Sequence, residues 1–311
     1  MIPARAFGPA SCGNVIAGFD TLGAALAPVS GERWGDFVEL TPAAARSLDC
    51  DGPFAHQLPA GTENLVWRAA DALARRARVE LPAFRVRLTK GLPVGSGVGS
   101  SSASIVALLR ALDGALGLSL SDDVLLAAAG DAESGASGAL HLDNVAPALL
   151  GGLRLVHADG SATALPFFDE LRFVIASPAL LLETRAARAV LPAALSLPDA
   201  LLHAQRLATL VHALHSGDRE RFRGALVDGI AEPHRAALVP GFAAVQRAAG
   251  EAGAWGCSFS GAGPAMLALA PAGDSAGVGE AMTRAWSEAG IAAEVRECVL
   301  DRRGARLTED A

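Results

Sequence analysis

A glycine- and serine-rich stretch, 95-GSGVGSSS-102, is the part of the sequence best suited to bind an anion. Glycines at alternating positions let a ligand approach the backbone closely, because they carry no Cβ atom. If a helix begins after them, its first N–H groups are unpaired and its dipole adds positive charge at the same point, which suits a phosphate. The stretch therefore predicts a phosphate-binding loop. The alternative is a tight connection whose serines cap the next helix.

Two common nucleotide-binding motifs do not fit this stretch. It lacks the Gly-Lys-Ser/Thr ending of a Walker A loop. Gly95, Gly97 and Gly99 follow a GxGxG spacing rather than the GxGxxG of a dinucleotide-binding fold. The stretch therefore supports neither of these families.

The flanking residues predict the elements that position the stretch. Residues 84–89 alternate between hydrophobic and polar side chains, the pattern of a half-buried strand. Isoleucine and leucine at positions 105, 108, 109, 112 and 116 form the stripe of an amphipathic helix. Gly117 is typical of a helix end. The predicted order is a strand, a glycine loop and a helix N-terminus.

Charge and hydropathy argue against several classes of protein. The 311 residues carry a formal net charge of −7 and contain no basic run, so we expect no nucleic acid partner. Every apolar run is shorter than the ~18 residues of a membrane helix, and Asn14 and Asp20 interrupt an N-terminal segment that superficially resembles a signal peptide. We therefore expect no membrane association. The four cysteines are far apart and in no metal-ligand spacing, which predicts free thiols and a cytoplasmic protein.

The length of the chain allows two domains. Helical patterns become more frequent beyond about residue 160, so we predict an N-terminal domain over residues 1–160 and a C-terminal domain over 161–311. Short strands and helices occur without regular βα alternation, which favours an α+β fold. A helix is expected from Ser121 toward Glu133, and residues 134–152 predict a loop.

Several segments, in order along the chain, resemble the motifs of one enzyme superfamily. Residues 93–104, PVGSGVGSSSAS, resemble the phosphate-binding signature of the GHMP kinases, with Val98 and Ser102 in place of the usual leucine and alanine. The segments that resemble homoserine kinases within this superfamily are NVIAGFD (14–20), HLDNVAP (141–147), TRAARAVLP (184–192), EPHRAALVPG (232–241) and GCSFSGAGPAMLAL (256–269). Ile16 and Ala17 replace a Gly-Pro pair of the family pattern, which leaves the shape of that turn open.

The resemblance implies a fold and an activity. The fold would be that of a two-domain GHMP kinase, with an N-terminal domain like domain 2 of ribosomal protein S5 and a ferredoxin-like C-terminal domain. The activity would be the ATP- and Mg²⁺-dependent phosphorylation of the L-homoserine hydroxyl to O-phospho-L-homoserine, a step toward threonine, by a homodimer. The hydroxyl would attack the γ-phosphate in line, without a dedicated protein base. The alternatives are a GHMP kinase for a sugar or an isoprenoid alcohol, and a non-catalytic nucleotide-binding regulator.

The resemblance also assigns a role to each matching residue. The residues expected at the nucleotide are Asn64, Lys90, Pro93, Gly95, Ser96, Gly97, Val98, Gly99, Ser100, Ser101 and Ser102. Those expected at the acceptor are Asn14, Asp20, His141, Thr184, Arg188 and Arg235. Ser101 and Glu133 would hold Mg²⁺, and Asn14, Glu133 and Arg235 form the expected catalytic set. Asp20 would pair with the ammonium group, Asn14 would orient the hydroxyl, and the planar forks of the two arginines suit the carboxylate.

Each of these residues also has an ordinary structural interpretation. Asn64 can begin a helix, Glu133 can be a solvated carboxylate near a helix end, and the arginines can be surface charges. Asp143 and Asn144 are typical of an Asx turn that shapes a loop. The glycine-rich turn at 260–264 either completes the site or simply joins two strands.

Overall fold

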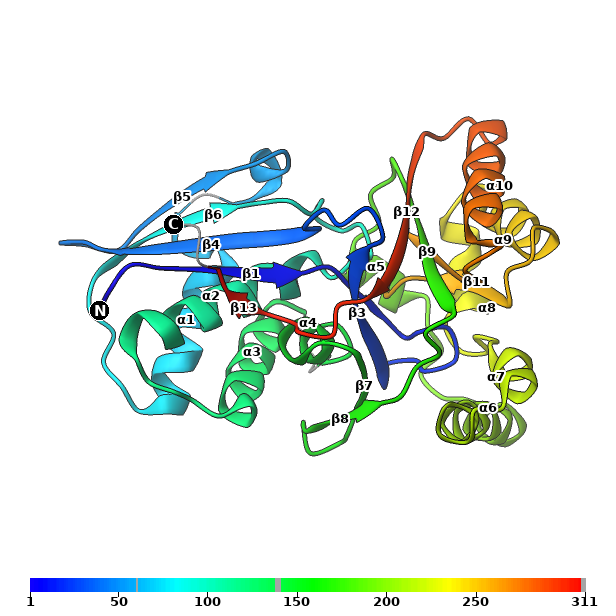
Figure 1. Cartoon of the computed structure of the whole chain (residues 1–311), viewed down its shortest axis with the longest axis horizontal. Helices are drawn as coiled ribbons and strands as arrows, with labels where there is room; N and C mark the ends of the chain where they lie inside the picture. The colour runs from blue at the N-terminus through cyan, green and yellow to red at the C-terminus, as the bar shows by residue number, and fades with distance from the viewer. Residues whose placement is uncertain (60, 138–140, 309–311) are drawn as a thin grey trace.

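The computed structural model describes residues 1–59, 61–137 and 141–308. These residues form two β-sheets, each with its own helices, that lie side by side along the long axis of the molecule (Figure 1). One hydrophobic cluster fills the space between the first sheet and its helices, and two further clusters cover opposite faces of the second sheet. The protein therefore has two packed units, and the glycine loop lies where they meet.

The first sheet has the strand order β13-β1-β4-β6-β5 and is covered by helices on one face (Figure 1). Its strands are β1 (Ala4–Pro9), β4 (Gly35–Pro42), β5 (Ser47–Asp51), β6 (Phe84–Thr89) and β13 (Arg306–Leu307). Its helices are α1 (Leu65–Ala77), α2 (Ser100–Leu116), α3 (Asp122–Ser137) and α4 (Val145–Leu150). Along β6, Phe84, Val86 and Leu88 are buried whereas Arg85 and Arg87 are exposed, which confirms the predicted alternation.

The second sheet has the strand order β10-β11-β9-β12-β3-β7-β8, with β2 paired to β3. Its strands are β2 (Ser11–Gly13), β3 (Leu22–Pro28), β7 (Leu153–Val156), β8 (Ala162–Leu165), β9 (Leu171–Pro178), β10 (Gly256–Phe259), β11 (Met266–Pro271) and β12 (Ala293–Leu300). The helices of this unit are α5 (Thr184–Ala189), α6 (Leu197–Ser216), α7 (Arg219–Ala225), α8 (Glu232–Arg235), α9 (Phe242–Glu251) and α10 (Ser275–Glu288). Short 3₁₀ turns are η1 (Ala55–Gln57), η2 (Gly61–Glu63) and η3 (Ala236–Leu238).

This architecture confirms the α+β fold class, but the two sheets exchange segments of chain. The early strands β2 and β3 belong to the second sheet, and the last strand, β13, returns to the first. A single cut near residue 160 therefore does not separate the sheets, and the division into domains 1–160 and 161–311 stays a prediction.

The segment predicted as a loop over residues 134–152 is partly helical. The helix α3 continues to Ser137, and α4 occupies Val145–Leu150. Residues 138–140 lie outside the described part of the chain. The prediction was wrong at α4 because a six-residue helix is too short for a periodic pattern and contains Pro147, which is tolerated only because it lies in the first turn.

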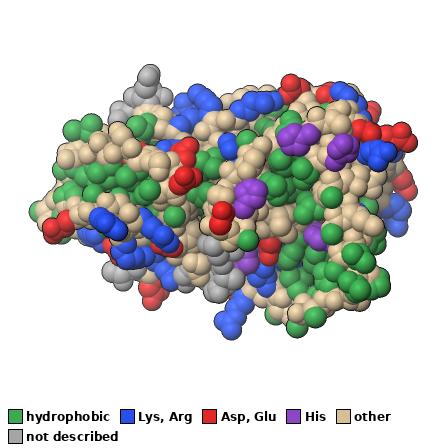
Figure 2. Space-filling view, turned by 90° about the horizontal axis from the view of Figure 1, so that it is seen from below, with side chains coloured by type: hydrophobic (Ala, Val, Ile, Leu, Met, Phe, Trp, Pro, Cys, Tyr) green, Lys and Arg blue, Asp and Glu red, His purple; other side chains and the backbone are tan. Residues whose placement is uncertain are grey.

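Three features of the structure concern the expected partners of the protein: its cysteines, the hydropathy of its helices and the charges on one face. All four cysteines are free. Within residues 1–59, 61–137 and 141–308, no helix has the length and hydropathy needed to cross a membrane. On the face shown in Figure 2, basic side chains lie in small groups beside acidic ones, so this face offers no concentrated positive surface.

A glycine in β1 allows α2 to pack closely on the first sheet. An added Cβ at Gly8 would lie 2.1 Å from the carbonyl oxygen of Ala103. We expect Gly8→Ala to force α2 away from β1 and to lower the free energy of unfolding by about 1–3 kcal/mol. Thermal unfolding measures this effect. The control is Gly277→Ala in α10, where an added Cβ meets nothing within 4 Å. This change should raise the free energy of unfolding by roughly 0.5–1 kcal/mol. If Gly277→Ala lowered it as much as Gly8→Ala does, close packing at Gly8 would not be the cause.

Candidate active site

The glycine loop, residues 91–99, joins β6 to the N-terminus of α2. Gly95, Gly97 and Gly99 all have positive φ angles, of 65°, 84° and 69°. Gly99 is the N-cap of α2 and supplies no side-chain hydrogen bond to the first turn. Because Gly99 has no side chain to cap the helix, the first N–H groups of α2 can take an anion as their partner, together with the positive end of the dipole. The interpretation of the serines as helix caps is therefore wrong.

The glycine-rich turn at 260–264 packs against the glycine loop. The Ser260 hydroxyl donates to the carbonyl of Gly97 at 2.7 Å, and the amide of Ala265 donates to the carbonyl of Ser96 at 3.1 Å. A Cβ added at Gly97 would lie 2.6 Å from the carbonyl oxygen of Ser260. Because Gly97 has no side chain, the turn can pack directly on the glycine loop, and its role in completing the site stays a prediction.

Ser101 and Glu133 face each other across α2 and α3. The Ser101 hydroxyl donates to Glu133 Oε1 at 3.0 Å. Burial raises the pKa of Glu133, and the hydrogen bond from Ser101 opposes that rise. Among the described residues, no three or more His, Cys, Asp or Glu side chains gather into a metal cage. One carboxylate and one hydroxyl fit Mg²⁺, which usually takes few protein ligands and completes its shell with phosphate and water.

A left-handed turn, residues 14–20, contains two of the residues expected at the acceptor, Asn14 and Asp20. Asn14, Val15 and Ile16 have consecutive positive φ angles of 69°, 39° and 65°, and Asp20 follows with 54°. Such angles are costly for β-branched residues. The Val15 and Ile16 side chains are buried in the second-sheet core, and that burial offsets the strain. The departure from the family's Gly-Pro pair therefore leaves a tight turn in place.

Asn14 is used to hold this turn. Its Nδ2 donates to the carbonyl of Gly261 at 2.8 Å, its Oδ1 accepts from the amide of Asp20 at 2.9 Å, and the residue is only 3 % exposed. This position differs from the expectation that Asn14 orients the acceptor hydroxyl. The side chain instead ties the turn to the glycine-rich turn at 260–264.

Arg188, Asp20 and His141 form one charged cluster beside that turn. Two guanidinium nitrogens of Arg188 donate to the Asp20 carboxylate at 2.7 and 3.1 Å, and Nη2 also donates to His141 Nδ1 at 3.0 Å. Because arginine can only donate, Nδ1 must accept, so the imidazole carries its proton on Nε2. Burial, with Arg188 adding to it, lowers the pKa of His141 and keeps the ring neutral at pH 7.

Two buried donors in this cluster have no partner among the residues that the structure describes. They are Nε of Arg188 and Nε2 of His141. An unsatisfied buried donor costs free energy, and at a functional site it marks a position for a ligand acceptor. The cluster therefore has spare capacity for an anionic group.

Arg235 is a buried cation next to the same cluster, so the interpretation of it as a surface charge is wrong. It is 1 % exposed and donates to the carbonyls of Ala187 at 2.9 Å and Gly261 at 3.1 Å. Phe19 lies near both arginines, with its ring centroid 5.6 Å from the Arg235 guanidinium carbon and 5.9 Å from that of Arg188. This aromatic contact orients the two cations. Phe19 was missed by sequence reasoning, although it lies inside the NVIAGFD motif.

Most of the remaining candidate residues lie in or directly beneath the glycine loop, whereas Asn64 and the acceptor candidate Thr184 lie elsewhere. Asn64 is the N-cap of α1, where its Oδ1 accepts from the amide of Val66 at 3.2 Å, and this supports its helix-start interpretation.

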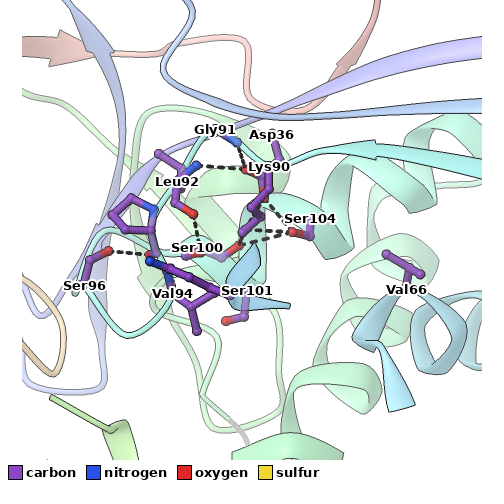
Figure 3. Close-up of polar contacts among 12 residues, drawn as sticks. Asp36, Val66, Lys90, Gly91, Leu92, Val94, Ser96, Ser100, Ser101 and Ser104 are labelled. Carbon is purple, nitrogen blue, oxygen red and sulfur yellow. Dashed lines mark hydrogen bonds and ion pairs between the residues drawn. The ribbon is translucent and has the colours of Figure 1, made fainter. Parts of the chain in front are cut away.

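Lys90 is buried under the loop and donates to groups of the protein itself (Figure 3), which differs from the expected approach to the nucleotide. Ser96 donates to the carbonyl of Pro93 at 2.7 Å and shapes the loop. Of the further candidates, Val98 and Ser102 are buried, Ser100 donates to the carbonyl of Leu92, and Thr184 is exposed on the same helix as Arg188.

Asn144 is the second residue that the site assignment missed. Its Oδ1 accepts from the Ser11 hydroxyl at 3.0 Å. Its amide lies within 3.5 Å of the Cβ positions that side chains would occupy at Gly13, Gly99 and Gly261. Three glycine segments thus surround this half-buried amide, where acceptor and phosphate would meet. Asn144 lies in the HLDNVAP motif, but from the sequence it was interpreted only as part of an Asx turn and was not assigned to the site.

Family models match both parts of the chain. Residues 64–152 match the N-terminal domain of GHMP kinases, and residues 210–291 match the C-terminal domain of GHMP kinases. The homoserine kinase from Cytophaga hutchinsonii is 32% identical, with 99% of this chain and 98% of that chain covered and a TM-score of 0.92. A proposed homoserine kinase from Listeria monocytogenes is 23% identical over 98% of this chain and 99% of its own, with a TM-score of 0.70.

A more distant similarity concerns the fold alone. Lactococcus lactis galactokinase, solved with galactose, is 16% identical over 99% of this chain and 95% of its own, with a TM-score of 0.71. The two matched family domains indicate a small-molecule kinase that uses ATP. The chain belongs to the GHMP kinase family and has its two-domain fold.

Asp143 supplies a pH-dependent test of this geometry. Burial raises its pKa from 3.8 to about 7, and the neighbouring Asp20 carboxylate adds to the rise. Between about pH 4 and pH 7 the unfolded chain has lost this proton while the folded protein keeps it, so the side chain's contribution to the free energy of unfolding falls as pH rises through this window.

We therefore expect wild-type protein to lose stability relative to Asp143→Asn by on the order of 4 kcal/mol between pH 4 and pH 7, with no further change above. Asparagine keeps an oxygen acceptor, so the comparison isolates the charge. Chemical denaturation of both proteins across this range measures the difference. A difference that does not depend on pH would mean that Asp143 is ionised in the folded protein throughout.

Proposed function

We propose that this protein transfers the γ-phosphate of ATP to the hydroxyl of L-homoserine and forms O-phospho-L-homoserine, a step toward threonine. The observation that carries the proposal is a set of groups complementary to an amino acid zwitterion, Arg188, Arg235 and Asp20, next to an uncapped helix N-terminus. The similarity to the Cytophaga hutchinsonii homoserine kinase over nearly the whole chain supports it.

The nucleotide half of the site acts mainly through the backbone. The triphosphate would lie along residues 97–102, where the glycines allow close approach and the first N–H groups of α2 provide donors. Glu133 and Ser101 would hold Mg²⁺, which would neutralise charge on the phosphates. Burial raises the pKa of Glu133, so a cation beside this carboxylate would stabilise its charged form.

The acceptor half binds a zwitterion through charges that already face each other. Arg188 and Asp20 pair with one another, and the substrate would exchange this contact for one between Arg188 and its carboxylate and one between Asp20 and its ammonium group. Arg235 and the Nε2–H of His141, which has no acceptor among the described residues, add donors for the same carboxylate. A neutral sugar would leave these charges unmatched, which favours an amino acid over the alternative acceptors.

The chemical step needs positioning more than a protein base. Asn144, among the three glycine segments, is our candidate to orient the hydroxyl for in-line attack on the γ-phosphate, and the proton leaves to phosphate or solvent. The single lysine, Lys90, is held by Asp36 and does not assist a base. The Asp143 carboxylate packs against the backbone of Gly13, which supports a structural role.

Arg188, Arg235 and Asp20, which we call the amino acid clamp, predict that loss of one arginine weakens binding of the acceptor but not of ATP. Arg188→Leu should raise KM for L-homoserine by about 30- to 100-fold, because a charge-assisted bidentate pair contributes about 2–3 kcal/mol. KM for ATP should change little. Steady-state kinetics with each substrate varied gives both values. The matched control is Arg185→Leu, because Arg185 is an exposed arginine on the same helix, and this variant should behave like wild type. An unchanged KM for L-homoserine in Arg188→Leu would refute the clamp.

The proposal as a whole is tested by the acceptor preference of the purified protein. We would measure ADP release with ATP and Mg²⁺ in the separate presence of L-homoserine, L-serine, L-threonine, mevalonate and galactose. A strong, Mg²⁺-dependent preference for L-homoserine is expected. Preference for another acceptor would retain the phosphate site and refute the amino acid clamp.

Glu133→Gln distinguishes an enzyme from a nucleotide-binding regulator. This variant should bind ATP but lose turnover by a factor of about 100 or more, because the charge-neutralising metal is lost. Full turnover in the variant would mean that the metal assignment is wrong. Binding of ATP by wild type without turnover on any acceptor would favour the regulator.

A further inference from the structure

A buried ion pair between Lys90 and Asp36 lies directly beneath the glycine loop (Figure 3). Lys90, the only lysine of the chain, is 1 % exposed and Asp36 is 0 % exposed. We propose that this pair is a positioning device that fixes the glycine loop relative to the first turn of α2 and thereby sets the affinity for ATP. The inference rests on the nucleotide-binding part of the proposed function and is independent of the acceptor.

The contacts of the pair span both ends of the loop. At the start of the loop, Asp36 Oδ1 accepts from the amides of Gly91 at 2.9 Å and Leu92 at 3.2 Å. At its far end, Lys90 Nζ donates to the carbonyl of Ser100 at 2.7 Å and to the hydroxyl of Ser104 at 2.9 Å, and also to Asp36 Oδ2. The Ser104 hydroxyl donates to the same Asp36 oxygen. One closed network therefore joins β4, the loop and α2.

Stability alone does not account for this arrangement. Burial lowers the pKa of Lys90 below its ordinary value, and the contact with Asp36 opposes that shift. Replacing a buried ion pair by uncharged residues is often neutral or even stabilising, because the desolvation cost disappears with the charges. What hydrophobic residues do not reproduce is the set of directed hydrogen bonds at both loop ends, and these bonds define the geometry of the loop.

The choice of lysine fits the same role. The chain uses arginine at its other basic positions. An ammonium group has three donors on a compact centre, whereas guanidinium has a wide planar fork. Lys90 directs its donors to three acceptors on two elements, Asp36 of β4 and Ser100 and Ser104 of α2, in a space closed to solvent. We therefore expect Lys90→Arg not to restore the function of the network.

The consequence for the site lies in the orientation of the N–H groups. Phosphate affinity depends on donors held close to their productive positions, and small displacements are costly. Ser100 and Ser101 are the first residues of α2, so a shift of the Ser100 carbonyl moves the same turn that presents these donors and the Ser101 hydroxyl. Loss of the network should therefore raise the Kd for ATP. It should change KM for the acceptor much less, and the rise in Kd should not depend on a loss of folding stability.

The test compares two double variants, each of which removes the charges of one ion pair. Lys90→Met/Asp36→Asn removes both charges, so no unpaired charge stays buried, and the asparagine keeps an oxygen for the amides of Gly91 and Leu92. The matched control, Arg87→Met/Asp51→Asn, removes a solvent-exposed pair between β6 and β5. The readouts are the Kd of a fluorescent N-methylanthraniloyl-ATP, the unfolding temperature, and KM for L-homoserine.

We expect the buried variant to raise the Kd for the fluorescent ATP by about 10-fold or more, while KM for L-homoserine changes by less than about 3-fold. The control should keep the wild-type Kd. An unchanged Kd in a folded buried variant, whatever its unfolding temperature, would overturn the proposal and leave the pair a purely structural element. Failure of wild type to phosphorylate L-homoserine would refute the proposed acceptor without affecting this result, because the Kd is measured in the absence of acceptor.

A milder variant covers the case in which the double variant does not fold. Ser104→Ala keeps the ion pair but removes one hydroxyl that contacts both partners. It should raise the Kd for the fluorescent ATP by about 3-fold, and Lys90→Arg should also bind more weakly than wild type. Wild-type affinity in Ser104→Ala would contradict the positioning role.

Discussion

The structure depends on one constraint: the first N–H groups of α2 must be held rigidly and yet remain without a protein acceptor. Unpaired donors at a helix N-terminus are costly unless water or a ligand accepts from them. Here the N-cap is a left-handed glycine that offers no side-chain acceptor. Gly8 lets the helix approach β1, and the pair of Lys90 and Asp36 holds the loop from below. The fold thus leaves the proposed phosphate site accessible.

The same constraint explains why the site lies between the two sheets. The glycine loop belongs to the first unit, whereas the turns at 14–20 and 260–264 lead from strands of the second. Glycines at 13, 97, 99 and 261 allow these backbones to come together around Asn144. On the proposed acceptor side, Arg188 and Asp20 form an ion pair with each other. The site is therefore assembled from charges and strained turns that neither unit supplies alone.

Sequence reasoning predicted the strand, glycine loop and helix because each has a local pattern. Alternation marked β6, the apolar stripe marked α2, and both were confirmed. It did not predict that Lys90 would meet Asp36, 54 positions away, because no periodicity identifies the partner of a buried charge. The resemblance therefore assigned Lys90 to the nucleotide, and Phe19 was missed because no local pattern indicates which cations an aromatic ring will face. The exchange of β2, β3 and β13 between the sheets was also invisible, since strand pairing over long separations leaves no local signal.

The most direct measurement of the central claim is the fate of the γ-phosphate. ³¹P NMR of the protein with ATP, Mg²⁺ and L-homoserine would follow it through the reaction. We predict a new phosphomonoester resonance that is coupled to the methylene protons of the amino acid and that grows in equal amount with ADP. Appearance of inorganic phosphate in place of that ester, or persistence of ATP, would contradict the assignment of the charged cluster beside α2 as a site for an amino acid acceptor.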